Sequence, residues 1–121
     1  MSTNAVILFA HGAREPEWAQ SFVRVRDHLR GAGMRVELAF LEIMSPSLED
    51  AVRDLVAEGH KRLTIVPLFL AQGRHLKREL PEMIARIRER HAGTDFRVTA
   101  ALGEAPEIVA AVAAWAERVS R

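Results

Sequence analysis

Three side chains that can bind a metal ion or move a proton each follow a strand-like apolar segment of this sequence. They are His11, Glu42 and His75. In open parallel α/β sheets, ligands bind beyond the carboxyl ends of the strands, at the point where the strand order reverses. The position of these three residues therefore makes them candidates for a functional site.

Two imidazoles and one carboxylate suit a first-row divalent ion such as iron, cobalt, nickel or zinc. A site with so few protein ligands stays open, and its ion is exchangeable, which favours metal delivery or Lewis-acid chemistry over structural binding. Glu42 is either a third ligand or a general base, and the sequence leaves both roles open. The simpler alternative is that each of the three is an ordinary loop residue.

Cationic side chains lie close in sequence to the two histidines. They are Arg14, Arg74, Lys77 and Arg78. Arginine pairs with carboxylates through two parallel hydrogen bonds, so these residues are candidates for binding a polyanionic ligand. Solvent-exposed surface charge is the alternative. The remaining histidines fall late in predicted helices or just after them, where the negative end of the helix dipole explains them: His28, His60 and His91.

The elements that must position these residues are four strands and four helices in alternation. The first strand, 5–10, is apolar throughout, as expected for a strand buried on both faces of a sheet. The other predicted strands are 35–41, 63–70 and 96–101. Pro67 interrupts the third of these and indicates a bulge or an early end to pairing.

Each predicted helix has an apolar stripe and a start signal. Pro16 opens the first, and Ser47 with Asp50 forms a capping pattern for the second. The third begins either near His75 or at Pro81. The stripe of the first helix is Trp18, Phe22, Val25 and Leu29, and that of the fourth is Ile108, Val112, Trp115 and Val119. We expect both tryptophans in the core; an exposed ring would instead belong to a dimer or ligand surface.

This alternation predicts an α/β fold with a single open parallel four-stranded sheet and helices on both faces. The flavodoxin-like order 2-1-3-4 places strands one and three side by side, with the switch point between them. His11 and His75 would flank that point, and Glu42 would lie one strand away. Since neighbouring strands are about 4.8 Å apart, both imidazoles are expected to reach one ion.

Composition narrows the class of protein. The 121 residues predict one domain, 1–121, and a net charge of +1 gives no reason to expect binding to nucleic acid or to a membrane. The absence of cysteine rules out disulfides and thiolate metal sites within the chain. No signal peptide or membrane span is apparent, so we expect a cytoplasmic location.

The sequence contains three segments that together match the pattern of a known protein family. In chain order they are HGAR, FLEIMSPSLEDAV and VPLFLAQGRHLKRELP. The sequence resembles the short CbiX/SirB-type class II chelatases, the sirohydrochlorin cobaltochelatases and ferrochelatases, over nearly its whole length. The resemblance implies a parallel α/β chelatase fold and insertion of a divalent metal, Co²⁺, Fe²⁺ or Ni²⁺, into sirohydrochlorin. It also implies that His11 and His75 bind this metal and that Glu42 is the acid of the site.

The same resemblance implies a homodimer, a tetrapyrrole substrate and no tightly bound cofactor, with the metal ion as a substrate. It leaves open the physiological metal and the pathway served, whether towards cobalamin, sirohaem or a nickel tetrapyrrole. The chain departs from the family at Arg74, where many members have a small residue, and at Glu79, which stands two residues before Pro81.

Two other functions compete with the chelatase. A carrier would bind metal or tetrapyrrole at the same residues without turnover. A phosphohistidine phosphatase or mutase would share the His-Gly pair, but that group has Arg-His-Gly, and Ala10 precedes His11 here.

Overall fold

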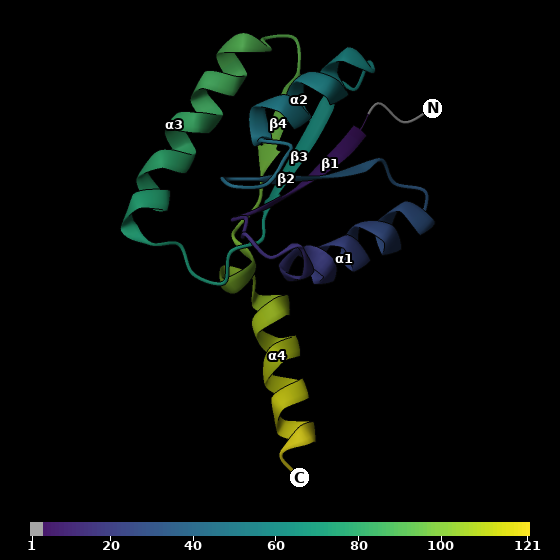
Figure 1. Ribbon diagram of the computed structural model, residues 1–121, viewed down its shortest axis with the longest axis vertical. Helices are drawn as coiled ribbons and strands as arrows, with labels where there is room; N and C mark the ends of the chain where they lie inside the picture. Colours follow the sequence, from purple (N-terminus) through teal and green to yellow (C-terminus); the bar gives the residue numbers. More distant parts are fainter. Residues whose placement is uncertain (1–3) are drawn as a thin grey trace.

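A four-stranded parallel sheet forms the centre of the computed structural model, which describes residues 4–121 (Figure 1). The strands are β1 (Asn4–Ala10), β2 (Val36–Phe40), β3 (Arg62–Pro67) and β4 (Asp95–Val98). Their order is β2-β1-β3-β4, and each neighbouring pair is parallel. The predicted fold class and strand order are confirmed.

The third strand ends at a proline, which has no backbone N–H. β3 ends at Pro67, which pairs with Phe9 in register, so this strand is three residues shorter at its carboxyl end than predicted. Proline has no N–H to donate to the ladder, and the expected early end of pairing is confirmed. Leu68 then donates its N–H to the Phe9 carbonyl at 2.7 Å, which keeps the chain beside β1.

The helices are α1 (Gln20–Gly31), α2 (Leu48–Ala57), α3 (Arg74–Arg90) and α4 (Pro106–Val119). Two short 3-10 helices, η1 (Pro16–Ala19) and η2 (Leu102–Glu104), precede α1 and α4. The predicted cap of α2 is confirmed, because the Ser47 hydroxyl accepts the N–H of Asp50 at 3.2 Å. α3 begins at Arg74 with Pro81 in its interior, which answers the question that the sequence left open.

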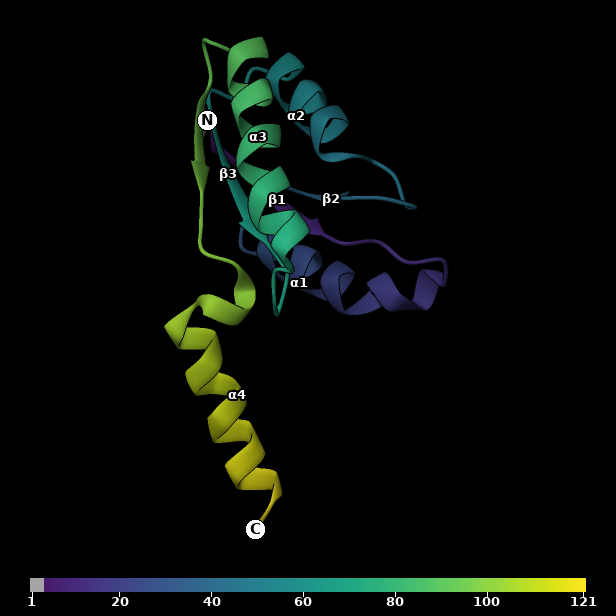
Figure 2. The same ribbon diagram turned by 90° about the vertical axis from the view of Figure 1, so that its left-hand side faces the viewer.

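The helices cover the two faces of the sheet unequally. α2 and α3 pack on one face, where the core includes Ile7, Phe9 and Ile65. The other face is covered by α1, over the side chains of β1 and β2 such as Leu8 and Leu38. Figure 2 shows α2 and α3 together on one side of the sheet and α1 on the other.

The fourth helix does not join this core, which corrects one expectation. α4 contains no buried residue, and both views show it extending away from the sheet (Figures 1 and 2). Trp115 is 57% exposed, so its placement in the core was wrong; no other described element of the protomer packs over its stripe. The placement of Trp18 in the core was also wrong: it lies in η1, is 36% exposed and packs against the ring of Phe22. Val25 of α1 is exposed as well.

An ion pair ties the start of β2 to the end of α2. Arg35 donates two hydrogen bonds to the Glu58 carboxylate, at 3.1 and 2.8 Å. The guanidinium holds the pKa of the Glu58 carboxyl below its usual range. The same pair, together with Glu37, raises the pKa of Arg35. Within residues 4–121, no helix has the length and apolar character needed to cross a bilayer.

Candidate functional site

A histidine and a glutamate meet at the carboxyl ends of the two adjacent strands β1 and β2. His11 Nε2 lies 2.8 Å from Glu42 Oε1, and both side chains are about half exposed. Two backbone hydrogen bonds continue the ladder past the strand ends: Leu41 donates to Ala10, and Glu42 donates to His11. The sheet itself therefore fixes the spacing of this pair.

Gly12 allows the two loops to approach each other. Its φ is +102°, and a Cβ atom at this position would lie 2.0 Å from the carbonyl oxygen of Glu42. Glycine is the only residue that adopts this φ at low cost and has no Cβ atom to clash with the Glu42 carbonyl. Gly12 thus holds His11 and Glu42 within hydrogen-bonding distance.

The loop that carries Glu42 has an unusual backbone. Ile43 has a φ of 69° and is exposed. A β-branched residue in the left-handed region costs of order 1–3 kcal/mol and persists only where its surroundings enforce it. Met44 donates to the Glu42 carbonyl at 2.7 Å and closes the turn.

Apolar side chains border His11 at the carboxyl ends of β1 and β3. The Phe69 ring packs edge-on against the His11 ring at 6.3 Å between centroids, and also against Phe9 at 5.6 Å. A cavity of about 400 Å³ lies beside His11, and its lining includes Trp18, Phe22 and Leu68. The imidazole therefore has a carboxylate on one side and an apolar pocket on the other.

The second predicted metal ligand lies apart from this pair. His75 is in the first turn of α3, its side chain is 93% exposed, and its nearest charged partner is Glu79 at 3.7 Å. Within the described part of the chain, no group of three or more His, Asp or Glu side chains is close enough to hold one metal ion. The structure thus shows two separate His–Glu pairs, and the joint binding of one ion by His11 and His75 stays a prediction.

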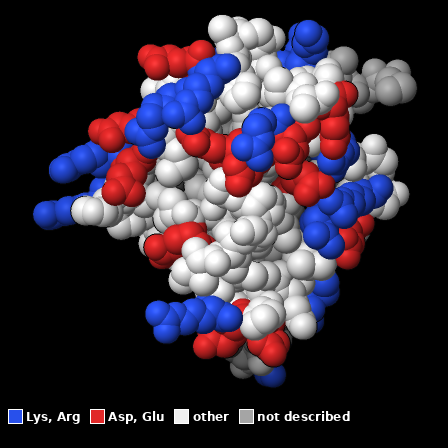
Figure 3. Space-filling view, turned by 45° about the horizontal axis from the view of Figure 1, so that its top comes forward, with Lys and Arg blue, Asp and Glu red and all other residues white. Residues whose placement is uncertain are grey.

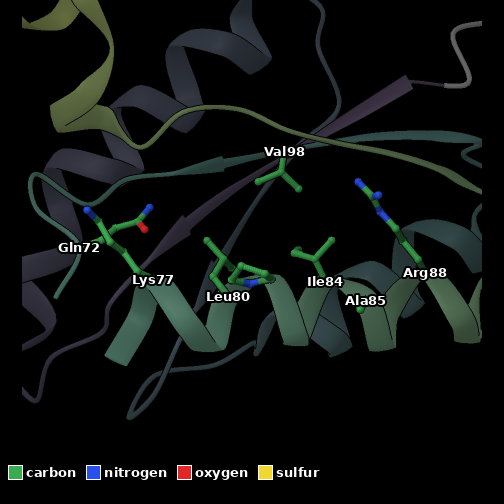
Figure 4. Close-up of a pocket in the computed structure, with 8 residues that line it drawn as sticks. Gln72, Lys77, Leu80, Ile84, Ala85, Arg88 and Val98 are labelled. Atoms are coloured by element: carbon green, nitrogen blue, oxygen red, sulfur yellow. The ribbon is translucent and has the colours of Figure 1, made fainter. Parts of the chain in front are cut away.

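The four predicted substrate-binding cations are all exposed: Arg14, Arg74, Lys77 and Arg78. Lys77 lines a cavity of about 390 Å³ between α3 and β4. Figure 4 shows Lys77, Leu80 and Ile84 on α3 facing Val98 of β4, with Gln72 at one end and Arg88 at the other. This cavity does not include His11, so we assign the candidate site to the strand ends and not to this apolar groove.

Charge is distributed unevenly over the surface. In the view of Figure 3, acidic and basic side chains are interspersed around the molecule, and uncharged atoms form a continuous area in the middle. No single-sign patch dominates this face, in keeping with the net charge of +1.

Three contributions to the site were missed by the sequence analysis. Glu79 was detectable, since it stands four residues after His75 and the two face one another once α3 begins at Arg74. Phe69 looked like any strand residue, and its contact with His11 depends on β1 and β3 being neighbours. Gly12 was part of the quoted HGAR segment, but its approach to Glu42 depends on a tertiary contact.

Comparison with known proteins identifies relatives of this chain. A family model described as CbiX matches residues 5–120. The sirohydrochlorin cobaltochelatase of Saccharolobus solfataricus is 31% identical over 100 residues, which are 79% of this chain and 78% of the relative. That of Saccharolobus islandicus is 35% identical over 79 residues, and the matched part is only 62% of its length.

Solved structures show the same architecture. A putative cobalamin (vitamin B12) biosynthesis CbiX protein from Marinobacter aquaeolei superimposes with a TM-score of 0.83 at 30% identity, over 95% of both chains. The sirohydrochlorin chelatase SirB from Bacillus subtilis subspecies spizizenii, in complex with cobalt, gives 0.74 at 27% identity. That match covers 98% of this chain and 51% of SirB. The predicted family is confirmed: this chain belongs to the CbiX family.

Proposed function

We propose that this protein inserts a divalent metal ion into sirohydrochlorin. The observation that carries the proposal is the His11–Glu42 pair at the strand ends of a CbiX-family fold. Relatives named sirohydrochlorin cobaltochelatase support the substrate, and the SirB structure in complex with cobalt supports a metal of this class. A SirB structure with Fe³⁺ keeps iron beside cobalt as a candidate.

The hydrogen bond to Glu42 supports one nitrogen of His11 over the other as the proposed metal ligand. A carboxylate accepts, so Nε2 carries the proton and donates it to Glu42 Oε1. When Nε2 carries the proton of the neutral imidazole, Nδ1 has a free lone pair and is the proposed metal ligand. Metal-binding histidines commonly donate their other N–H to a carboxylate, which fixes the tautomer and raises the basicity of the ligand.

Insertion also requires that two pyrrole N–H protons leave the macrocycle. Glu42 is exposed enough to meet substrate, and its carboxylate is the proton acceptor adjacent to His11. His75, whose charged neighbour is Glu79, supplies the second imidazole for the incoming ion in this proposal.

The carboxylates of sirohydrochlorin need cationic partners. Arg14, Arg74, Lys77 and Arg78 are exposed and make no ion pair with another described residue, so they are available to a polyanion. Bidentate binding by arginine would orient the macrocycle over the strand ends. We propose a homodimer, because one domain leaves the His11–Glu42 pair half exposed and a second copy would exclude water from it. A cytoplasmic location stays a prediction.

Histidine substitutions test the proposal. His11→Ala and His75→Ala are each expected to slow metal insertion about 100-fold or more, since loss of a ligand exceeds loss of an outer hydrogen bond. The measurement is the change in sirohydrochlorin absorbance with Co²⁺, alongside circular dichroism to show that the fold is intact. His28→Ala, in the exposed last turn of α1, is the matched control and should retain full activity. Full activity of both site variants would contradict the ligand assignment.

A further inference from the structure

His75 and Glu79 lie on one exposed face at the start of α3. They are four residues apart in the helix, so their side chains are neighbours, one turn apart on the same side. His75 Nε2 lies 3.7 Å from Glu79 Oε1, and the two side chains are 93% and 51% exposed. Both groups are therefore open to an ion that arrives from solvent.

The separation of these two atoms suits a shared metal ion better than a hydrogen bond. Imidazole nitrogen and carboxylate oxygen bind first-row divalent ions at about 2.1 Å, so two such atoms on one ion lie about 3.0–3.6 Å apart at bond angles of about 90–120°. An N–H···O hydrogen bond needs about 3.2 Å or less. Two histidines at the same i, i+4 spacing bind zinc in helical metalloprotease motifs. A small movement of these exposed side chains therefore lets both bind one ion.

The His11–Glu42 pair is built differently. Its Nε2 and Oε1 atoms are 2.8 Å apart, which is a hydrogen-bonding distance and shorter than two ligand atoms on one ion require. Glu42 therefore holds the His11 ring in place. The His75 ring makes no hydrogen bond and no ring contact with another described residue, so it can turn with an ion bound to it.

We propose that His75 and Glu79 form a capture site, which takes the divalent ion from solvent and passes it to His11. Nε2 of His75 and an oxygen of Glu79 bind the ion first. Nδ1 of His11 then replaces the Glu79 oxygen, while His75 keeps its bond to the ion. This step is a ligand exchange without any change in oxidation state. The destination of the ion rests on the proposed function, whereas the capture site itself does not.

The topology of the sheet keeps this transfer within one edge of the molecule. β1 and β3 pair along their whole length, so the segments that carry His11 and His75 leave the same edge side by side. The ring of Phe69, in the connection from β3 to α3, packs against the ring of His11 at 6.3 Å between centroids. The connection that leads to His75 therefore runs beside the receiving imidazole.

The charge around the capture site favours release of the ion. Arg74 and Arg78 lie one residue before His75 and three residues after it, and α3 begins at Arg74, so the positive end of the helix dipole is also here. These groups oppose the binding of a cation, so the ion is held weakly and exchanges readily. Lys77 faces the groove beside Val98 instead (Figure 4). The charges thus suit transfer and not storage of metal.

Paramagnetic Co²⁺ tests the capture site without tetrapyrrole. Co²⁺ is added to the free protein, and proton NMR follows the broadening of the histidine ring signals, which His11→Ala and His75→Ala assign. The His75 signals should broaden at a lower Co²⁺ concentration than the His11 signals. Glu79→Gln should raise the concentration needed at His75 about tenfold or more, since it removes a ligand. Glu79→His exchanges one ligand type for another and should retain binding.

Glu82→Gln is the matched control for charge. It removes the same charge from the same exposed face of α3, about one turn beyond Glu79. Within the described part of the chain, no three metal-binding side chains are close enough to share an ion, so Glu82 is not a third ligand. We expect the Co²⁺ concentration that broadens the His75 signals to change less than twofold in this variant.

Four outcomes of the NMR measurement would overturn the capture site. Two are unchanged binding at His75 in Glu79→Gln and lost binding in Glu79→His. A third is an equal loss in Glu79→Gln and Glu82→Gln, which would make Glu79 a source of charge only. The fourth is parallel broadening of the His11 and His75 signals, which would mean that one ion binds both from the start.

Metal insertion tests the transfer to His11. Glu79→Gln should raise the KM for Co²⁺ about tenfold and lower kcat much less, because capture is lost while the final ligands remain. An unchanged KM for Co²⁺ would overturn the transfer. The NMR measurement uses no sirohydrochlorin, so failure of the capture site is distinct from failure of the chelatase.

Discussion

At the residue scale, the proposed function depends on the hydrogen bond between His11 and Glu42. The sequence placed both residues at strand ends but left Glu42 either a ligand or a base. The 2.8 Å contact adds a third role, in which the carboxylate orients the imidazole. A carboxylate has two oxygens, so one can accept the hydrogen bond from His11 while the other takes up a proton or binds a metal ion.

Glu42→Gln separates these roles. The amide oxygen of Gln still accepts from His11 Nε2, but the side chain no longer takes up protons. We expect metal insertion to fall about 100-fold or more, and the affinity for Co²⁺, measured by calorimetry, to change only slightly. A large loss of Co²⁺ affinity would instead make Glu42 a ligand.

Gly12→Ala tests the close approach that holds the pair together. The new methyl group would overlap the Glu42 carbonyl oxygen, and the φ of +102° would be strained. We expect the free energy of unfolding to fall by about 2 kcal/mol or more in urea titrations. Gly93→Ala, which has open space around its Cβ position, is the control and should change stability little. Equal stability of the two variants would contradict this explanation of Gly12.

Sequence reasoning at this scale found residue types and positions but not contacts. His11, Glu42 and His75 were identified because strand ends are visible as the limits of apolar segments. The pairing of His11 with Glu42, and of His75 with Glu79, depends on side-chain directions that no pattern records. The role of Gly12 depends on a neighbour 30 residues away in the chain.

At the element scale, strands and caps were predictable because local chemistry decides them. The Ser47 cap and the end of β3 at Pro67 both follow from the donors that the backbone has or lacks. The destination of α4 was not predictable, since an amphipathic helix has the same pattern whether it packs on its own sheet or on another copy. Trp115 was therefore placed wrongly.

Glu58→Gln tests the ion pair that ties β2 to α2. The pKa of Glu58 is lowered in the folded protein, so the pair stabilises the fold above the unfolded pKa of about 4.3, and this stabilisation is lost as the pH falls. We expect the variant to be less stable by up to about 1 kcal/mol at pH 7, because the pair is largely exposed. The difference in stability between the variant and the unsubstituted protein should shrink steadily as the pH falls below about 4.3. Thermal unfolding measured from neutral to acidic pH gives this difference in stability. Glu89→Gln, which changes an exposed glutamate, is the control. A stability difference that does not depend on pH would contradict this explanation.

At the scale of the whole molecule, the strand order places every functional candidate at one edge of the sheet. Strands β1 and β3 are neighbours, so the segments that carry His11 and His75 leave the sheet side by side. This topology was predicted from the alternation of strands and helices together with the family resemblance. The half-exposed state of the site was not visible in the sequence, and it makes a second copy part of the proposed enzyme.

The central claim is catalysis, and the most direct test is multiple turnover. Sirohydrochlorin and Co²⁺ are mixed with a small, substoichiometric amount of protein, and absorbance is followed against a protein-free reaction. A chelatase converts many equivalents of substrate per protein chain at a rate above the spontaneous reaction, and this is the result that we predict. Conversion limited to one equivalent per site, or no acceleration with Co²⁺, Fe²⁺ or Ni²⁺ by the folded protein, would contradict the claim and identify a carrier.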